Sequence, residues 1–113
     1  MKVTMTTANK PAFQAKVDSR FENAMRGFIN NGENRLKNNY KLNSKINDFN
    51  NYGHNNYTIK LQQQYTASGM EYTMKAVNNE KEVTLAKRRS FRKIVEKFLN
   101  YDRKEFNSRM KNA

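Results

Sequence analysis

The chain has 113 residues, a formal net charge of +12 and no cysteine, and 36% of its residues are hydrophobic. This length and composition are typical of one small domain with a lean core, spanning residues 1–113, and the lack of cysteine excludes disulfides and thiolate metal sites. No run approaches the roughly 18 apolar residues of a membrane span, and residues 1–13 have no signal-peptide pattern, so we expect a cytoplasmic protein without a membrane partner.

The excess of Lys and Arg indicates a polyanionic partner. Such a charge raises the local concentration of nucleic acid or nucleoprotein, and an acidic protein is the second partner it favours. Asparagine and lysine are both abundant, which suggests an AT-rich coding sequence and would fit a phage or other viral source.

Two elements are predicted before residue 33. Residues 2–7 alternate around Val3 and Met5 and predict a short strand, with a frayed terminus as the alternative. Pro11 is favoured in a first helical turn, and Asn30-Asn31-Gly32 is a typical helix end. The helix between them would bury residues at helical spacing, namely Phe13, Val17, Phe21, Ala24, Met25, Phe28 and Ile29.

Residues 30–56 are polar and rich in asparagine. Leu42, Ile46 and Phe49 share one helical face, so we predict a helix over residues 33–49. The asparagines weaken a helix, and a long polar excursion is the alternative. Residues 50–56, including Tyr52, would then form a loop.

Three strands are predicted next. Residues 57–66 and 70–76 alternate between apolar and polar side chains around a short turn that contains Gly69, which predicts a hairpin. Val83 and Leu85 predict a third strand over residues 82–86. One face of this sheet is apolar and must be covered by helices.

The last helix starts between Thr84 and Ser90, and Ser90 is a suitable N-cap. Its apolar positions continue to Leu99, and a break near Asn100 is an alternative to one continuous helix. The fold class is therefore α+β, with an antiparallel three- to four-stranded sheet, helices on one face, and the order β-α-(α)-β-β-β-α.

Few residues could carry catalysis or hold a metal. His54 is the single histidine, in an asparagine-rich loop without an evident orienting partner. The four glycines are isolated and form no phosphate loop. We expect no enzymatic activity, no metal and no cofactor.

The strongest candidate site is the basic run before and within the last helix. Cations at a helix start oppose the helix dipole, so contact with an anion explains them better than helix stability does. The alternative is a solvated face on which Glu96 and Glu105 form local ion pairs. The residues proposed to bind nucleic acid or an acidic partner are Lys87, Arg88, Arg89, Arg92, Lys93 and Lys97.

Tyrosines could add stacking contacts with bases. Tyr57 and Tyr65 are expected on the core face of their strand, which leaves Tyr52 as the candidate for base stacking.

From the sheet onward, the order of elements resembles that of double-stranded-RNA-binding domains. Ala86-Lys87-Arg88-Arg89 stands where that family has the basic, phosphate-gripping start of its last helix. With the leading strand, the order is also similar to that of ribosome hibernation factors, which bind ribosomal RNA. Both resemblances concern topology rather than sequence motifs, and both imply RNA as a partner.

The resulting hypothesis is a non-enzymatic nucleic-acid-binding protein that contacts phosphates of structured RNA or DNA, or a nucleoprotein, through its basic C-terminal helix. The alternative is a small regulator or inhibitor that docks the same helix on an acidic protein surface.

Overall fold

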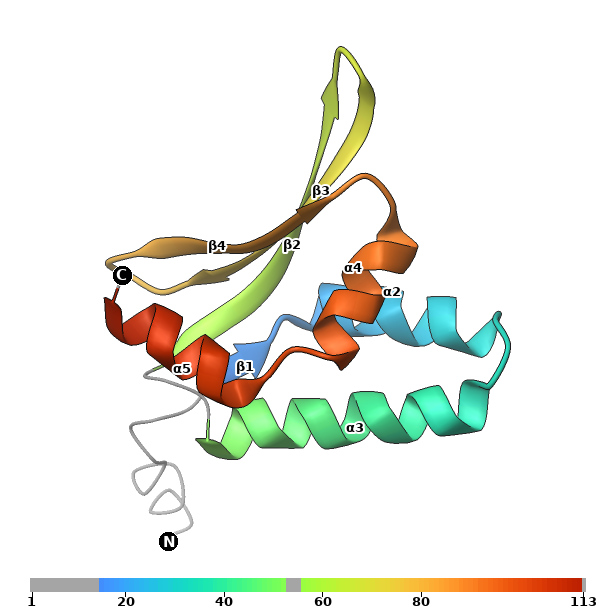
Figure 1. Ribbon diagram of the computed structural model, residues 1–113, viewed down its shortest axis with the longest axis horizontal. Coiled ribbons are helices and arrows are strands. Elements are labelled where there is room, and N and C mark those ends of the chain that lie inside the picture. The colour runs from blue at the N-terminus through green and yellow to red at the C-terminus, as the bar shows by residue number, and fades with distance from the viewer. Residues whose placement is uncertain (1–14, 53–55, 113) are drawn as a thin grey trace, which may run out of the picture.

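The computed structural model describes residues 15–52 and 56–112. Within these ranges, four strands form one sheet in the order β1-β2-β3-β4, and four helices lie on one side of it (Figure 1). The α+β class and the predicted order of elements are confirmed, whereas the strand predicted at residues 2–7 and His54 lie outside the described residues. In chain order the elements are β1 (Ala15–Val17), α2 (Ser19–Asn30), α3 (Arg35–Tyr52), β2 (Tyr57–Thr66), β3 (Gly69–Val77), β4 (Glu82–Arg88), α4 (Phe91–Leu99) and α5 (Arg103–Asn112).

The sheet is mixed, so the prediction of a purely antiparallel sheet is wrong. β1 pairs in parallel with β2, and the other two pairings are antiparallel. Parallel neighbours need a crossover connection, because the chain must return to the end at which the first strand began. Helices α2 and α3 provide this return. Helix α2 leads away from β1, and α3 runs back beneath α2 and β1 (Figure 1).

The sequence pattern predicted a helix from Pro11 to the Asn30-Asn31-Gly32 end; Pro11 lies outside the described residues, and the first described helix, α2, begins at Ser19. Val17, expected on the apolar face of that helix, belongs to β1 and pairs with Ile59. The backbone N–H of Asp18 donates to the carbonyl of Ile59 at 2.9 Å, so the strand ends directly at the helix start. Of the other residues predicted on the apolar face, Phe21, Met25 and Ile29 are buried, whereas Ala24 and Phe28 are exposed.

The asparagine-rich segment forms an 18-residue helix, α3. The predicted helix is confirmed, and the alternative of a polar excursion is wrong. Leu42, Ile46 and Phe49 are buried on one face, as their spacing predicted. Tyr52, expected in a loop, is the last residue of this helix.

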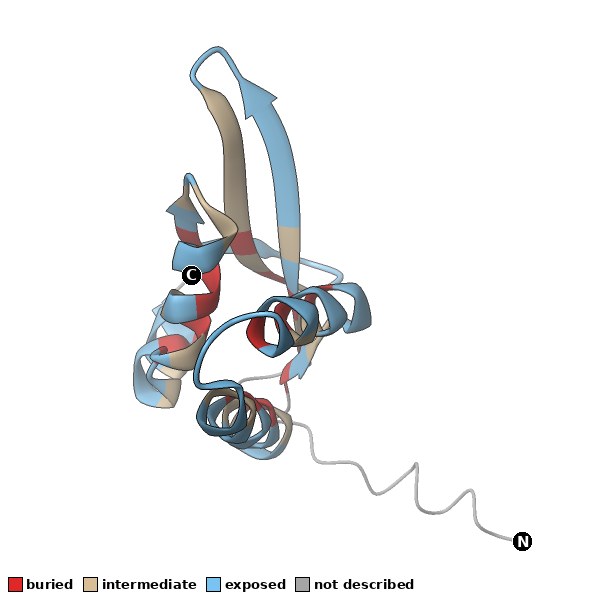
Figure 2. Cartoon of the chain, turned by 90° about the vertical axis from the view of Figure 1, so that its right-hand side faces the viewer, coloured by how far each residue is buried: buried red, intermediate tan, exposed pale blue. Residues whose placement is uncertain are grey.

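Aromatic rings join the helices into one core. The ring centroid of Phe49 lies 5.7 Å from that of Phe98 on α4 and 5.0 Å from that of Phe106 on α5. Of the two alternatives for the last helix, the break near Asn100 is confirmed, because α4 ends at Leu99 and α5 starts at Arg103. Between these helices Tyr101 is buried, so the linker itself contributes to the core, which lies between helices and sheet (Figure 2).

The distal half of the β2–β3 hairpin projects beyond the helices (Figures 1 and 2). Tyr65 lies on this projection and is 79% exposed, so the prediction that it lies in the core is wrong. Its strand does alternate as predicted, and Tyr57 on the same face is buried. Tyr65 is exposed because the helices that cover Tyr57 do not extend to the hairpin tip.

Burial of Tyr101 gives a testable pH dependence. Burial is the main cause that raises the pKa of Tyr101 above 10.0; Arg109 opposes the rise and Glu105 adds to it. Above pH 10 the unfolded chain therefore loses this proton before the folded chain does, and the free energy of unfolding falls as pH rises. We expect Tyr101→Phe to remove this part of the alkaline loss, measured by denaturant unfolding from about pH 8 to about pH 11. Tyr40→Phe, at an exposed tyrosine, is the control, and equal alkaline slopes for Tyr101→Phe and the unmodified chain would contradict the assignment.

Candidate nucleic-acid interface

The basic run lies at the junction of β4 and α4, not wholly within a helix. Strand β4, which the sequence predicted to end at Ala86, continues to Arg88. Ser90 then caps α4, and its side chain accepts a hydrogen bond from the backbone N–H of Lys93 at 3.3 Å. The predicted N-cap is therefore confirmed, and Lys87 and Arg88 are strand residues.

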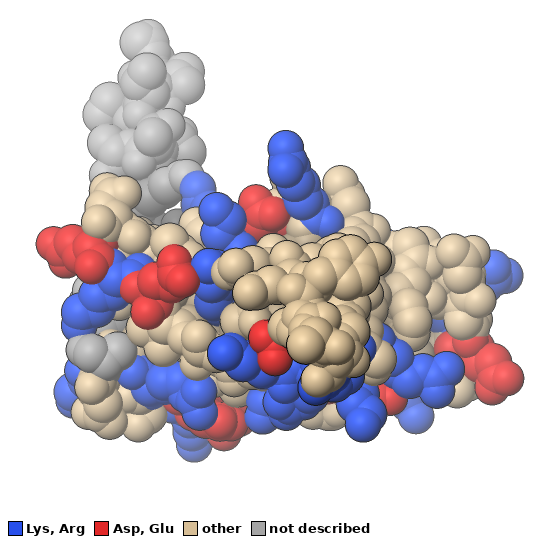
Figure 3. All heavy atoms as spheres, turned by 90° about the horizontal axis from the view of Figure 1, so that it is seen from above, with Lys and Arg blue, Asp and Glu red and all other residues tan. Residues whose placement is uncertain are grey.

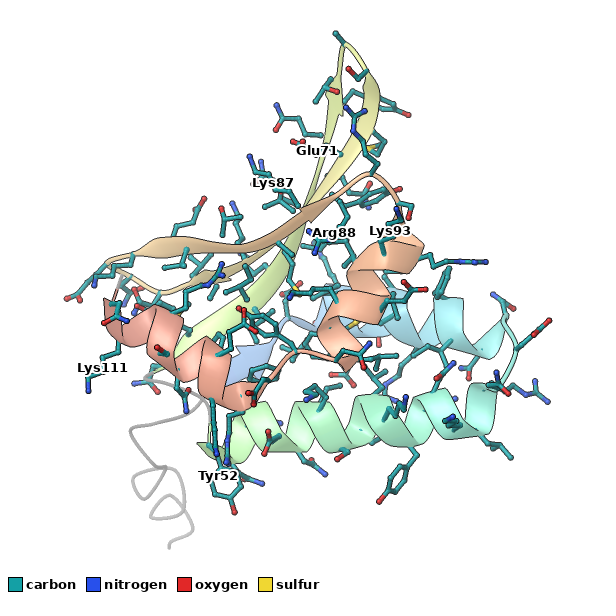
Figure 4. All side chains as sticks on the ribbon, viewed as in Figure 1. Tyr52, Glu71, Lys87, Arg88, Lys93 and Lys111 are labelled. Carbon is teal, nitrogen blue, oxygen red and sulfur yellow. The ribbon has the colours of Figure 1, made fainter. Side chains whose placement is uncertain are left out.

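Strand geometry separates Lys87 from Arg88. Lys87 pairs with Thr73 and is exposed on the outer face of the sheet, away from the helices. Arg88 pairs with Tyr72 on the inner face and is half-buried. Figure 4 shows Lys87 and Glu71 on one side of the sheet and Arg88 and Lys93 on the other. Lys87 therefore does not share a surface with the cations of α4.

A β-bulge in β4 decides which residue faces which side. The pairing between β3 and β4 shifts between Met74 and Lys75, and Leu85 is the extra residue. Both Leu85 and Ala86 are buried as a result. Without the bulge, alternation from Val83 would place Lys87 on the inner face and Arg88 on the outer face. The extra residue reverses these two positions.

Four cations gather where β4 meets α4: Arg88, Arg89, Arg92 and Lys93, which we call the basic junction. Three of them, Arg89, Arg92 and Lys93, have exposed side chains. Arg89 Nη1 donates to the backbone carbonyl of Ser68 at 2.9 Å, so the junction is tied to the tip of the hairpin. Arg92 borders a hollow of about 600 Å³ between α2, α3 and α4.

The other two predicted site residues lie elsewhere. Lys97 is half-buried, and its Nζ lies 5.0 Å from the ring centroid of Tyr101, in a cation–π contact. Tyr52 is 59% exposed, but the guanidinium carbon of Arg103 lies 4.9 Å from its ring centroid. Figure 4 places Tyr52 at the far end of the molecule from Lys93. The structure therefore does not bring Tyr52 to the basic junction.

The acids of the chain leave the basic junction unpaired. All ten Asp and Glu residues fall in the described ranges. Ion pairs in the described ranges include Arg26–Glu22, Lys75–Glu82, Arg103–Asp48 and Arg109–Glu105, and no acidic side chain in these ranges lies within ion-pair distance of a residue of the junction. The alternative of local ion pairs thus holds for Glu105 and not for Glu96.

Other chemistry finds little support in the described part of the chain. There, no three His, Asp or Glu side chains lie close enough together to hold a metal ion. None of the described helices combines the length and apolarity needed to cross a bilayer.

Comparisons with protein-family models, with curated proteins and with solved structures find no match to this chain.

Proposed function

We propose that this chain is a non-enzymatic nucleic-acid-binding module whose basic junction contacts the phosphates of structured RNA or DNA, free or within a nucleoprotein. The observation that carries the proposal is a group of four cations at one end of α4 with no acidic partner among the described residues. Like charges held together without counter-charges repel one another, and a polyanion relieves that repulsion.

The local geometry suits phosphate binding. Arg89 uses one N–H on the carbonyl of Ser68, and a guanidinium has five N–H donors, so the others can reach a phosphate. Arg92 and Lys93 lie in the first turn of α4, where the partial positive charge of the helix end adds to their own. Such contacts give affinity and orientation without reading sequence.

The salt dependence of binding tests the proposal. We expect the chain to bind random-sequence RNA or DNA duplexes, with affinity that falls linearly on a double logarithmic plot against salt. Each phosphate contact contributes a slope of about 0.9, so the four cations predict a slope of roughly −3 to −4. Fluorescence anisotropy with labelled duplexes measures it. Absence of binding to both duplexes and single strands at low salt would contradict the proposal.

An acidic protein surface is the second candidate partner, and a different surface favours it. On α3, Leu36 is 86% exposed and Tyr40 is 76% exposed. Exposed cations alternate with them at Arg35, Lys37 and Lys41. A mixed apolar and cationic helix face is more typical of protein recognition than of phosphate contact. Absence of nucleic-acid binding in the salt titration would favour an acidic protein as the partner.

A further inference from the structure

Most of β2 has an open edge. β1 pairs only with Tyr57, Thr58 and Ile59, whereas β2 continues to Thr66. Beyond Ile59, no described strand pairs with this side of β2, because β2 has only β1 and β3 as neighbours in the sheet. The open stretch coincides with the part of the hairpin that projects beyond the helices (Figure 2).

The backbone groups that face this edge can be assigned. The carbonyl of Ile59 points toward β1, since it accepts from the N–H of Asp18 at 2.9 Å. In an antiparallel ladder both backbone groups of one residue point to the same side, and successive residues alternate. Leu61, Gln63 and Tyr65 therefore present their N–H and C=O groups to the open edge.

Within residues 15–52 and 56–112, this edge has none of the usual protection against pairing. Natural edge strands are commonly blunted by lysine, proline, a bulge or a covering segment. Residues 61–66 contain no lysine and no proline, and the pairing of β2 with β3 is free of bulges. No charged residue occurs between Lys60 and Glu71, although the chain carries a net charge of +12. Figure 3 looks down on the hairpin and shows a mostly uncharged projection with both basic and acidic side chains around its base.

We infer that a second copy of this chain occupies the edge, through antiparallel pairing of β2 with β2 of the partner subunit about a two-fold axis at Gln63. In this register all three outward-facing residues bond, with Gln63 opposite its own copy and Leu61 opposite the partner subunit's Tyr65. A two-residue shift would leave one of the three without a partner. The charge-free stretch is also where two cationic chains can approach most closely.

The side chains are complementary in the same register. Leu61 is half-buried and Tyr65 is 79% exposed, and both lie on the inner face of the sheet. Pairing of an aromatic with an aliphatic residue across strands stabilises a sheet. It would also support a two-stranded projection that is only marginally stable alone. The two-fold axis would place both basic junctions on the same face of one continuous sheet.

Sedimentation velocity over a wide range of chain concentration, without nucleic acid, tests the inference. We expect a concentration-dependent shift from one chain to two. Gln63→Pro removes an edge N–H but no β2–β3 bond, and should weaken dimerisation about tenfold or more. Gln63→Ala keeps the N–H and should change it by less than about threefold. A monomer at every concentration, or a dimer unaffected by Gln63→Pro, would overturn the inference.

Cysteine cross-linking tests the register independently and does not require the proline variant to fold. The chain has no cysteine of its own. Hydrogen-bonded residues in an antiparallel pair have Cα atoms about 5.5 Å apart, which is within the range of a disulfide. Gln63→Cys should therefore cross-link readily under mild oxidation. Lys60→Cys is the control, because its two copies would lie about 20 Å apart. Equal cross-linking of both variants would overturn the proposed register.

Discussion

Replacing both Arg92 and Lys93 with alanine is expected to weaken duplex binding roughly fifty-fold at about 0.1 M salt. Each phosphate contact contributes about 0.9 to the slope of log affinity against log salt concentration, so two lost contacts lower this slope by about 1.8. Over the one decade between about 1 M and about 0.1 M salt, a slope of this size corresponds to roughly fifty-fold in affinity. Both side chains are exposed in the first turn of α4, so no core contact is removed. Removing cations from a helix N-terminus should, if anything, raise the free energy of unfolding by a few tenths of a kcal/mol.

The matched control is the double variant Lys104→Ala and Lys111→Ala. These two lysines are exposed on α5, and Figure 4 shows Lys111 far from Lys93. The control removes the same net charge, so it lowers general attraction to a polyanion equally. We expect it to reduce affinity much less than the Arg92 and Lys93 pair. Equal losses in the two double variants would show that net charge, and not the basic junction, drives binding.

Phe49→Ala is expected to lower the free energy of unfolding by about 3–5 kcal/mol. The Phe49 side chain is fully buried, and its ring contacts those of Phe98, Tyr101 and Phe106. Truncation would leave a cavity where α3, α4 and α5 meet. Since the free energy of unfolding of small domains is about 5–15 kcal/mol, this loss is a large fraction of the total stability. Denaturant unfolding followed by circular dichroism measures it.

Tyr40→Ala on the same helix is the control for Phe49→Ala. Tyr40 is 76% exposed, so its truncation should change the free energy of unfolding by no more than about 0.5 kcal/mol. The comparison tests whether α3 belongs to the core despite its many asparagines. Similar small effects for both variants would contradict the packing described for Phe49.

Sequence periodicity predicted the elements whose signals are local. The spacing of Phe21, Met25 and Ile29 marks the buried face of α2, and Leu42, Ile46 and Phe49 mark that of α3. The hairpin and the Ser90 cap were equally readable, since turn and cap residues act on their immediate neighbours.

Features that depend on distant partners were not predictable in this way. β1 is a strand only because Tyr57–Ile59 lies beside it, and Val17 also fits a helical repeat with Phe13 and Phe21. Asp18 and Ser19, both N-cap residue types, were the local signal for the true helix start.

The candidate site was only partly predictable for the same reason. A bulge at Leu85 and the extension of β4 to Arg88 place Lys87 and Arg88 on opposite faces of the sheet. Tyr65 is exposed because of where the helices end, which its own strand pattern does not contain.

The most direct test of the basic junction as the contact surface is an NMR titration of the ¹⁵N-labelled chain with a short RNA or DNA duplex. We predict that the largest amide shifts fall on Arg88, Arg89, Arg92 and Lys93 and on Ser68, which Arg89 contacts. Shifts centred instead on α3 near Leu36 and Tyr40, or on α5, would contradict the account.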